Sequence, residues 1–252
     1  LWEYDPSNDS WTLKSSMPLG LLGSKTFEIE NSGYVIGGLD SLFQPSTQCY
    51  KYDQLTDSWS TVTSCPGNNI VATMSDSLFG YAISDTVLYC YDPVGNSWTT
   101  KAPPPSSIYE TISGKVNSLL YLISSDGSVL SYNPVADTWI ENYSALGSNE
   151  RPRIYGRSLV LSDTAYFNLI KYDINSDNWI ADSTLNVNQW LYSIDSNLYA
   201  FRSGNYEKYN PVSRTWTSCS PCPVLSADYS FSTVVYGYIL GWSTNSTLEF
   251  WQ

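Results

Sequence analysis

The chain of 252 residues contains no histidine. This absence excludes Ser-His-Asp and Cys-His catalytic arrangements, histidine metal ligands and the commonest general base near neutral pH. The sequence also has no Gly-rich phosphate loop, no Walker motif and no HExxH motif. Carboxylate pairs among the 24 Asp and Glu residues remain conceivable. We therefore expect a non-catalytic protein that uses no metal and no cofactor.

Positive charge is scarce, because 12 Lys and Arg residues stand against 24 Asp and Glu residues and the net charge is −12. A nucleic acid would be repelled, since its binding depends on Lys and Arg at the phosphates, and an acidic membrane surface is disfavoured for the same reason. No apolar run approaches the roughly 18–20 residues that span a bilayer. The sequence favours a soluble monomer, with the cytoplasm slightly favoured over secretion. It opens inside a repeat, which indicates an excised domain or a processed chain.

The cysteines are too few, and odd in number, for a dense disulfide framework: Cys49, Cys65, Cys90, Cys219 and Cys222. The segment Cys219-Ser220-Pro221-Cys222 is a single C-x-x-C motif. A structural zinc site would need two more ligands. A local disulfide, a redox pair and ordinary loop thiols remain open interpretations.

Aromatic residues are abundant, with 21 Tyr, 10 Trp and 7 Phe, and such side chains favour β-sheets. One frame occurs six times: a Tyr, then Asp or Asn, then a Trp seven residues after the Tyr. The six tyrosines are Tyr4, Tyr52, Tyr91, Tyr132, Tyr172 and Tyr209, with successive spacings of 48, 39, 41, 40 and 37 residues. This period predicts a repeat architecture.

Each copy of the frame predicts a β-hairpin. Apolar residues precede the Tyr, the Asp-Pro or Asn-Pro segment has turn chemistry, and the Trp opens the next strand. Another strand pair precedes each hairpin, and its second strand is read, for example, at 33–38 and 237–241. Four strands in a repeat of about 40 residues predict one blade of a β-propeller, whose Trp is buried against the neighbouring blade.

The pattern resembles the kelch repeat, in which a Gly-Gly pair follows the second strand and is followed by Tyr-Asp-Pro and Trp. The resemblance covers essentially the whole chain, and it implies a single all-β domain over residues 1–252, a kelch-type propeller of antiparallel four-stranded blades. Gly37-Gly38 is the one complete pair; the other copies have Ser84, Ser124, Ser162, Arg202 and Gly241-Trp242 there. We expect differently shaped turns at those places. A sialidase-type Asp box matches less well, because residues 8–11 lack its Gly and Thr spacing.

Six copies predict six blades, with a longer ring of seven as the alternative. The closing blade is expected to combine both ends of the chain. Residues 223–241 would supply its inner strands, and the segment around Trp11 to Leu13 its outermost strand. Residues 1–5 and 247–252 both fit the remaining position. Closure of this kind removes open sheet edges.

Candidate ligand-binding residues come from the variable connections. In the kelch arrangement, the loops that join the second and third strands share one ring face with the interblade loops. The longest of the former, 39–47, explains the 48-residue spacing and contains Phe43. Phe43 either contacts a ligand or packs back onto its blade.

Three arginines and a tryptophan complete the candidates. Arg151 and Arg153 belong to a basic cluster at 150–157, although a Pro-Arg pair also fits the first strand of a kelch blade. Arg202 and Trp242 occupy double-glycine positions that would lie near the same face. In kelch adaptor proteins, Arg residues on this surface often bind acidic peptides through bidentate pairs, as the resemblance implies.

The resemblance favours a non-catalytic binding or scaffold propeller that recognises a protein or peptide through loops on one ring face. The alternative is a carbohydrate-binding or carbohydrate-modifying propeller, because exposed Trp and Tyr side chains stack on sugars. A glycan ligand therefore remains an open interpretation.

Overall fold

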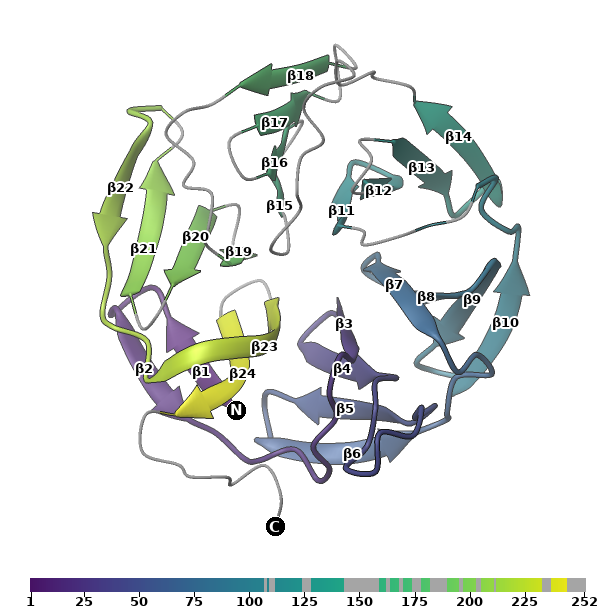
Figure 1. The fold of residues 1–252 in the computed structure, drawn as a ribbon, viewed down its shortest axis with the longest axis horizontal. Helices are drawn as coiled ribbons and strands as arrows, with labels where there is room; N and C mark the ends of the chain where they lie inside the picture. Colours follow the sequence, from purple (N-terminus) through teal and green to yellow (C-terminus); the bar gives the residue numbers. More distant parts are fainter. Residues whose placement is uncertain are drawn as a thin grey trace.

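Antiparallel sheets stand around a common centre in the computed structural model (Figure 1). The structure describes residues 1–106, 108, 112–123, 128–142, 159–161, 164–167, 170–173, 178–181, 190–194, 197–202, 205–210, 212–232 and 237–243. Within these residues, 24 strands form six four-stranded sheets. No helix in the same residues has the length and apolar character needed to cross a membrane.

Five sheets each use four strands that are consecutive in the chain. The first contains β3 (Lys25–Ile29), β4 (Ser32–Ile36), β5 (Cys49–Asp53) and β6 (Ser58–Val62). The second contains β7 (Ile70–Ser75), β8 (Gly80–Ser84), β9 (Val87–Asp92) and β10 (Ser97–Lys101). The third contains β11 (Ile112–Val116), β12 (Leu119–Ile123), β13 (Val129–Asn133) and β14 (Thr138–Asn142). The fourth contains β15 (Leu159–Leu161), β16 (Thr164–Phe167), β17 (Ile170–Asp173) and β18 (Asn178–Ala181). The fifth contains β19 (Trp190–Ile194), β20 (Asn197–Arg202), β21 (Asn205–Asn210) and β22 (Thr215–Ser218).

The remaining sheet, which we call the closing sheet, joins the two ends of the chain. Its strand order is β2 (Ser10–Leu13), β1 (Trp2–Asp5), β24 (Gly237–Ser243) and β23 (Val224–Ser232). The pairing of β1 with β24 aligns Trp2 with Ile239 and Tyr4 with Gly237. This confirms the predicted sharing of one sheet by both ends, and β1 occupies the third strand position. Residues 247–252, the other candidate for that position, lie outside the described residues.

The predicted propeller of antiparallel four-stranded blades is confirmed. The prediction of six blades needs a qualification, because five blades are contiguous in sequence. The number of four-stranded sheets in the described residues reaches six only when the composite closing sheet is included.

The hairpins of the repeated frame are built as their sequences predict. In the second copy, the Asp53 carboxylate accepts hydrogen bonds from the backbone N–H groups of Leu55 and Thr56, at 2.8 and 3.2 Å. Such a turn caps its own backbone and fixes the strand register. Tyr52 therefore lies directly opposite Trp59, with their ring centroids 5.1 Å apart. The equivalent Tyr and Trp pair up in all six hairpins.

Aromatic packing between blades forms much of the described core. Phe27 of β3 and Tyr34 of β4 stack at 4.8 Å, and both rings lie near Tyr91 of the next blade, at 6.5 and 5.6 Å. Gly80 of β8 leaves room for this packing, because a Cβ there would lie 2.2 Å from the Phe27 ring. Aromatic rings of neighbouring blades therefore interdigitate, and large aromatic rings contribute most to such a core.

Candidate binding surface

A repeated clamp fixes where four of the interblade linkers begin. Two residues before the Trp of a hairpin, an Asp or Asn side-chain oxygen accepts a hydrogen bond from the frame's own Tyr hydroxyl, at 2.7–2.9 Å. The same oxygen accepts the backbone N–H of a residue just beyond the last strand of the neighbouring sheet, at 2.7–2.9 Å. The Trp indole then donates to the carbonyl of that residue, at 2.8–3.0 Å. The acceptors are Asp9, Asp57, Asn96 and Asp137, and the clamped residues are Ser220, Ser15, Thr63 and Ala102, respectively.

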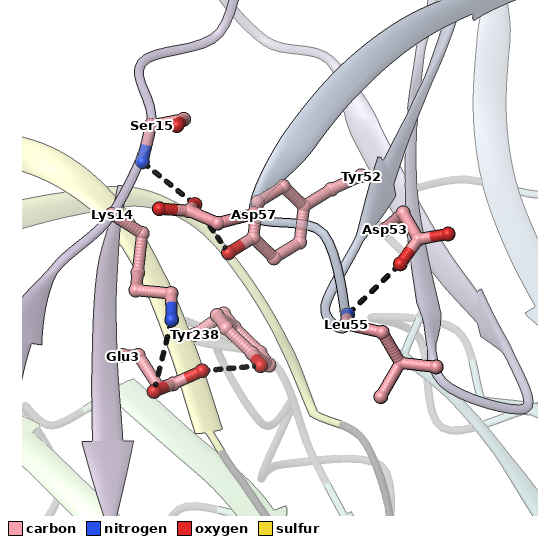
Figure 2. Close-up of polar contacts among 8 residues, drawn as sticks. All are labelled: Glu3, Lys14, Ser15, Tyr52, Asp53, Leu55, Asp57 and Tyr238. Atoms are coloured by element: carbon pink, nitrogen blue, oxygen red, sulfur yellow. Dashed lines mark hydrogen bonds and ion pairs between the residues drawn. The ribbon is translucent and has the colours of Figure 1, made fainter.

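Figure 2 shows one of these clamps, where Asp57 binds both the Tyr52 hydroxyl and the Ser15 amide. Burial raises the pKa of Tyr52 well above its ordinary value, and the hydrogen bond to Asp57 adds to the effect. Partial burial raises the pKa of Asp57, but the hydrogen bonds from Ser15 and Tyr52 outweigh it and leave the pKa below its ordinary value. The clamp therefore works with an ionised carboxylate and a neutral phenol.

A second polar network in Figure 2 strengthens the closing sheet. Glu3 of β1 accepts a hydrogen bond from the hydroxyl of Tyr238 in β24, at 2.6 Å. The other carboxylate oxygen of Glu3 lies 3.4 Å from the ammonium group of Lys14. The two ends of the chain are therefore joined by side chains as well as by the strand pairing.

The sequence indicated the Tyr and Trp of the clamp, but the acceptor between them was overlooked. Its signal is visible, because the position five residues after the Tyr is Asp or Asn in five of the six copies. These acceptors adopt positive φ angles of 45–53° at Asp9, Asp57, Asn96 and Asp137. Asp and Asn tolerate this left-handed conformation better than most residues, so backbone and clamp select the same side chains.

The connection between β4 and β5 rises from this fixed frame as a small hairpin. Leu39 exchanges backbone hydrogen bonds with Leu22 of the preceding linker, at 2.7 and 2.8 Å, and forms a further bridge with Pro45. Gly38 has a φ of +86°, and a Cβ there would lie 2.8 Å from backbone atoms of Leu22 and Ser24. The double glycine thus allows the linker and the hairpin base to lie in close contact.

The tip of this hairpin is held by Asp40. One Asp40 carboxylate oxygen accepts the N–H groups of Leu42 and Gln44, at 2.8 and 2.9 Å. The Asp40 backbone also donates to the Gln44 carbonyl and accepts from the Phe43 amide. The side chains of Leu42 and Phe43 are 75% and 65% exposed, so Phe43 does not pack back onto its blade. We call residues 39–45 the apolar hairpin.

The other predicted ligand-binding residues are placed only in part. Arg202 ends β20 and pairs with Asn205 across the turn to β21, which is the same type of connection as the apolar hairpin. Trp242 pairs with Ser226 inside the closing sheet. Nothing is described of the Arg202 and Trp242 side chains, and Arg151 and Arg153 lie outside the described residues. The five candidates are therefore not brought together as one site, and Phe43 is the candidate whose exposure the structure describes.

All five cysteines are free thiols. Cys219 and Cys222 flank Ser220, the linker residue that the closing sheet clamps. Burial raises the pKa of Cys219, which opposes thiolate chemistry at neutral pH. In the described parts of the chain, no three Cys, Asp or Glu residues are grouped so that they could hold a metal ion.

Four tryptophans whose side chains are described serve the architecture. Trp11, Trp59, Trp98 and Trp139 are partly buried, and each donates its indole N–H to a neighbouring linker. Aromatic richness, which motivated the carbohydrate interpretation, is explained at these positions by packing between blades.

Comparisons with known proteins agree with this architecture. No family model matches the chain. Kelch-like protein 25 of Xenopus tropicalis is 25% identical over 208 residues, which cover 71% of this chain and 35% of that protein. Kelch repeat and BTB domain-containing protein 6 of Homo sapiens is 24% identical over 223 residues, which cover 82% and 32%, respectively. The chain is a β-propeller that is similar to these kelch-repeat proteins.

An F-box/kelch-repeat protein of Arabidopsis thaliana is also similar, with 29% identity over 166 residues, which cover 63% of this chain and 31% of the relative. The chain spans about a third of the length of the curated relatives it matches. The similarity therefore concerns the propeller and not the remainder of those proteins.

Proposed function

We propose that this propeller is a non-catalytic binding module that recognises a protein or peptide through loops on one ring face. The observation that carries the proposal is the apolar hairpin, a rigid connection whose tip exposes Leu42 and Phe43. Binding residues are concentrated in loops that a rigid scaffold positions. The relatives support the same role, since kelch-repeat proteins are interaction modules.

The geometry of an antiparallel blade assigns the loops to one face. Because the four strands alternate in direction, the connection after the second strand and the linker after the fourth strand emerge on the same side. The apolar hairpin and the linker at 14–24 belong to these two classes, and hydrogen bonds between Leu22 and Leu39 hold them together. We infer that Arg151, Arg153, Arg202 and Trp242 contribute to the same face.

The absence of histidine supports a role without catalysis, because the chain lacks the commonest general base near neutral pH. The net charge of −12 supports a partner other than a nucleic acid or an acidic membrane. We propose that the module acts as a monomer.

The test compares wild type with a variant in which residues 39–45 are replaced by the shortest closing turn, Asp-Thr, as found between β8 and β9. Both proteins are immobilised, candidate binders are captured from the source extract, and each binder is purified and titrated directly. We expect at least one binder whose affinity drops tenfold or more in the variant. The proposal fails if no purified binder shows dependence on 39–45, Arg202 or Trp242.

A glycan array serves as the counter-test. We expect no reproducible signal for wild type. A signal that disappears on Trp242→Ala, while the melting temperature stays constant, would favour a carbohydrate ligand instead of a protein.

A further inference from the structure

We propose that the apolar hairpin is a hydrophobic anchor that inserts between the apolar side chains of a basic, amphipathic partner segment. This inference rests on the proposed binding function and specifies the chemistry of the partner. It reverses the expectation of an acidic peptide held by arginines, as far as this part of the face is concerned.

The first support is the conformation of Phe43. Its φ is +57°, a left-handed conformation that is costly for a bulky side chain and that Asn or Gly would adopt with less strain. Phe43 is also 65% exposed, so the strained residue does not gain burial inside its own chain. Backbone strain at an exposed aromatic residue points to a role outside the fold.

The second support is the rigidity of the tip. Asp40 holds the amides of Leu42 and Gln44, and the Gln44 side chain donates to the Leu42 carbonyl at 3.2 Å. The base is tied to the linker through Leu22 and Leu39. A preorganised apolar tip loses little conformational entropy when it binds, so its exposed area contributes efficiently to affinity.

The third support is the apolar surface beside the hairpin. Leu22, at the point where the linker bridges to the hairpin base, is exposed, and so is Leu19 of the same linker. Together with Leu42 and Phe43, these side chains make four exposed apolar residues. They lie on the linker and the apolar hairpin, which are joined by backbone hydrogen bonds. Such concentrations on a monomer mark interaction sites.

The charge of the neighbouring connections selects the partner. The described connections on this face are 14–24, 37–48, 63–69, 85–86, 102–106 and 219–223. Their charged residues are Lys14, Asp40 and Asp85, and Lys14 is paired with Glu3. Against a net charge of −12 for the whole chain, these segments offer two carboxylates and one cation, Lys14, which is paired, whereas Arg202 ends β20 at a different connection of this face. Lys or Arg residues around the apolar side chains of the partner would be attracted, and Asp or Glu residues repelled.

The test uses three labelled helix-forming peptides of 18 residues as probes. Each has Leu on one helical face, and the polar residue on the other face is Lys in the first peptide, Gln in the second and Glu in the third. Fluorescence anisotropy measures their affinity for wild type and for Leu42→Ser/Phe43→Asn. The matched control is Leu55→Ser/Val94→Ser, which removes two residues that are 81% and 95% exposed in the turns between β5 and β6 and between β9 and β10. All three proteins have the same net charge.

We expect wild type to bind the Lys peptide at least tenfold more tightly than the Gln peptide, and the Glu peptide most weakly. The hairpin variant should lose tenfold or more for the Lys peptide, and the control variant less than twofold. Since Asn accommodates a positive φ, the melting temperature of the hairpin variant should not fall below that of wild type.

Equal binding of the Lys peptide by all three proteins would overturn the inference, because attraction would then come from diffuse charge. A preference for the Glu peptide would also overturn the inference. If Arg202→Ala then abolished that preference, the proposed function would remain intact. If no peptide binds, the inference fails, and the capture experiment with purified binders decides separately about the proposed function.

Discussion

The interblade clamp and the apolar hairpin lie close together in the chain but differ in how often they occur. The clamp at Asp57 has described counterparts at three other seams, with nearly the same distances. The apolar hairpin has no such counterpart at the next blade, where β8 and β9 are joined by Asp85 and Thr86 alone. A repeated contact serves the ring, whereas a feature present at one connection is free to serve recognition.

Gly38→Ala should give the largest effect, because Gly38 is where the hairpin is attached to the frame. The new Cβ would lie 2.8 Å from backbone atoms of Leu22 and Ser24, at a φ of +86°. We expect a loss of about 3 kcal/mol in the free energy of unfolding, measured by urea titration. Gly23→Ala is the control, because its φ is +71° but no atom lies within 4 Å, so only backbone strain of about 1 kcal/mol should appear. Equal losses for the two variants would contradict a steric role for Gly38.

Asp57→Ala should have the next largest effect, since it removes a clamp without touching the hairpin. The buried Tyr52 hydroxyl and the Ser15 amide lose their acceptor. We expect a loss of about 2 kcal/mol in the free energy of unfolding. Asp57→Asn should cost less than about 1 kcal/mol, because Asn96 performs the same task at another seam. If the Ala variant is as stable as the Asn variant, the clamp is not a stabilising contact.

Arg214→Asn should sharpen the comparison by introducing the clamp acceptor in the copy of the frame that lacks Asp or Asn at this position. Arg214 occupies the acceptor position of the hairpin between β21 and β22, with a φ of +55°, and a guanidinium group has no acceptor. Asn suits the backbone and offers an amide oxygen, so we expect a gain of about 1 kcal/mol in thermal or urea unfolding. Arg214→Lys should give no gain. A gain with Lys would show that charge, and not the clamp, limits stability at this position.

Acid unfolding should show the smallest effect. Partial burial raises the pKa values of Asp9, Asp57 and Asp137, but their hydrogen bonds outweigh it and leave each pKa below its ordinary value. Their stabilisation is therefore complete above the unfolded value of about 4 and is lost as the pH falls through the lower folded pKa. The triple variant with Asn at all three positions should be less stable than wild type at neutral pH but lose less of its free energy of unfolding as the pH falls, as measured by urea titrations followed by Trp fluorescence. An equal loss in both proteins would show that these carboxylates do not govern acid unfolding.

Much of the frame could be predicted from sequence, because its determinants are local. The Tyr and Trp of a hairpin lie seven residues apart, and the Asp or Asn that caps the turn lies between them. The closing sheet was also predictable, since the chain opens with the third and fourth strands of a blade. The acceptor position was overlooked because its partner, a backbone amide of another blade, is distant in sequence: Asp9 and Ser220 are 211 residues apart.

The candidate site was harder to predict, because exposure depends on what surrounds a loop. The sequence placed Phe43 in a long loop but left open whether its ring was buried. The bridges from Leu22 to Leu39 and the turn around Asp40 decide that the tip points away from the blade. The turn around Asp40 is local, but the bridge from Leu22 to Leu39 has no sequence signature, because it depends on a linker meeting a loop from a different part of the chain.

By itself, the sequence determined the repeated β-hairpins, the lack of histidine chemistry and the acidic charge of this β-propeller. These properties are local or additive, so they can be read residue by residue. Only the tertiary structure decided that one Asp or Asn in each clamp ties two blades together, that β1 fills the closing sheet, and that Leu42 and Phe43 are exposed on a rigid tip. These features depend on contacts between a blade and a linker or between two blades, which form only when the separate segments pack together.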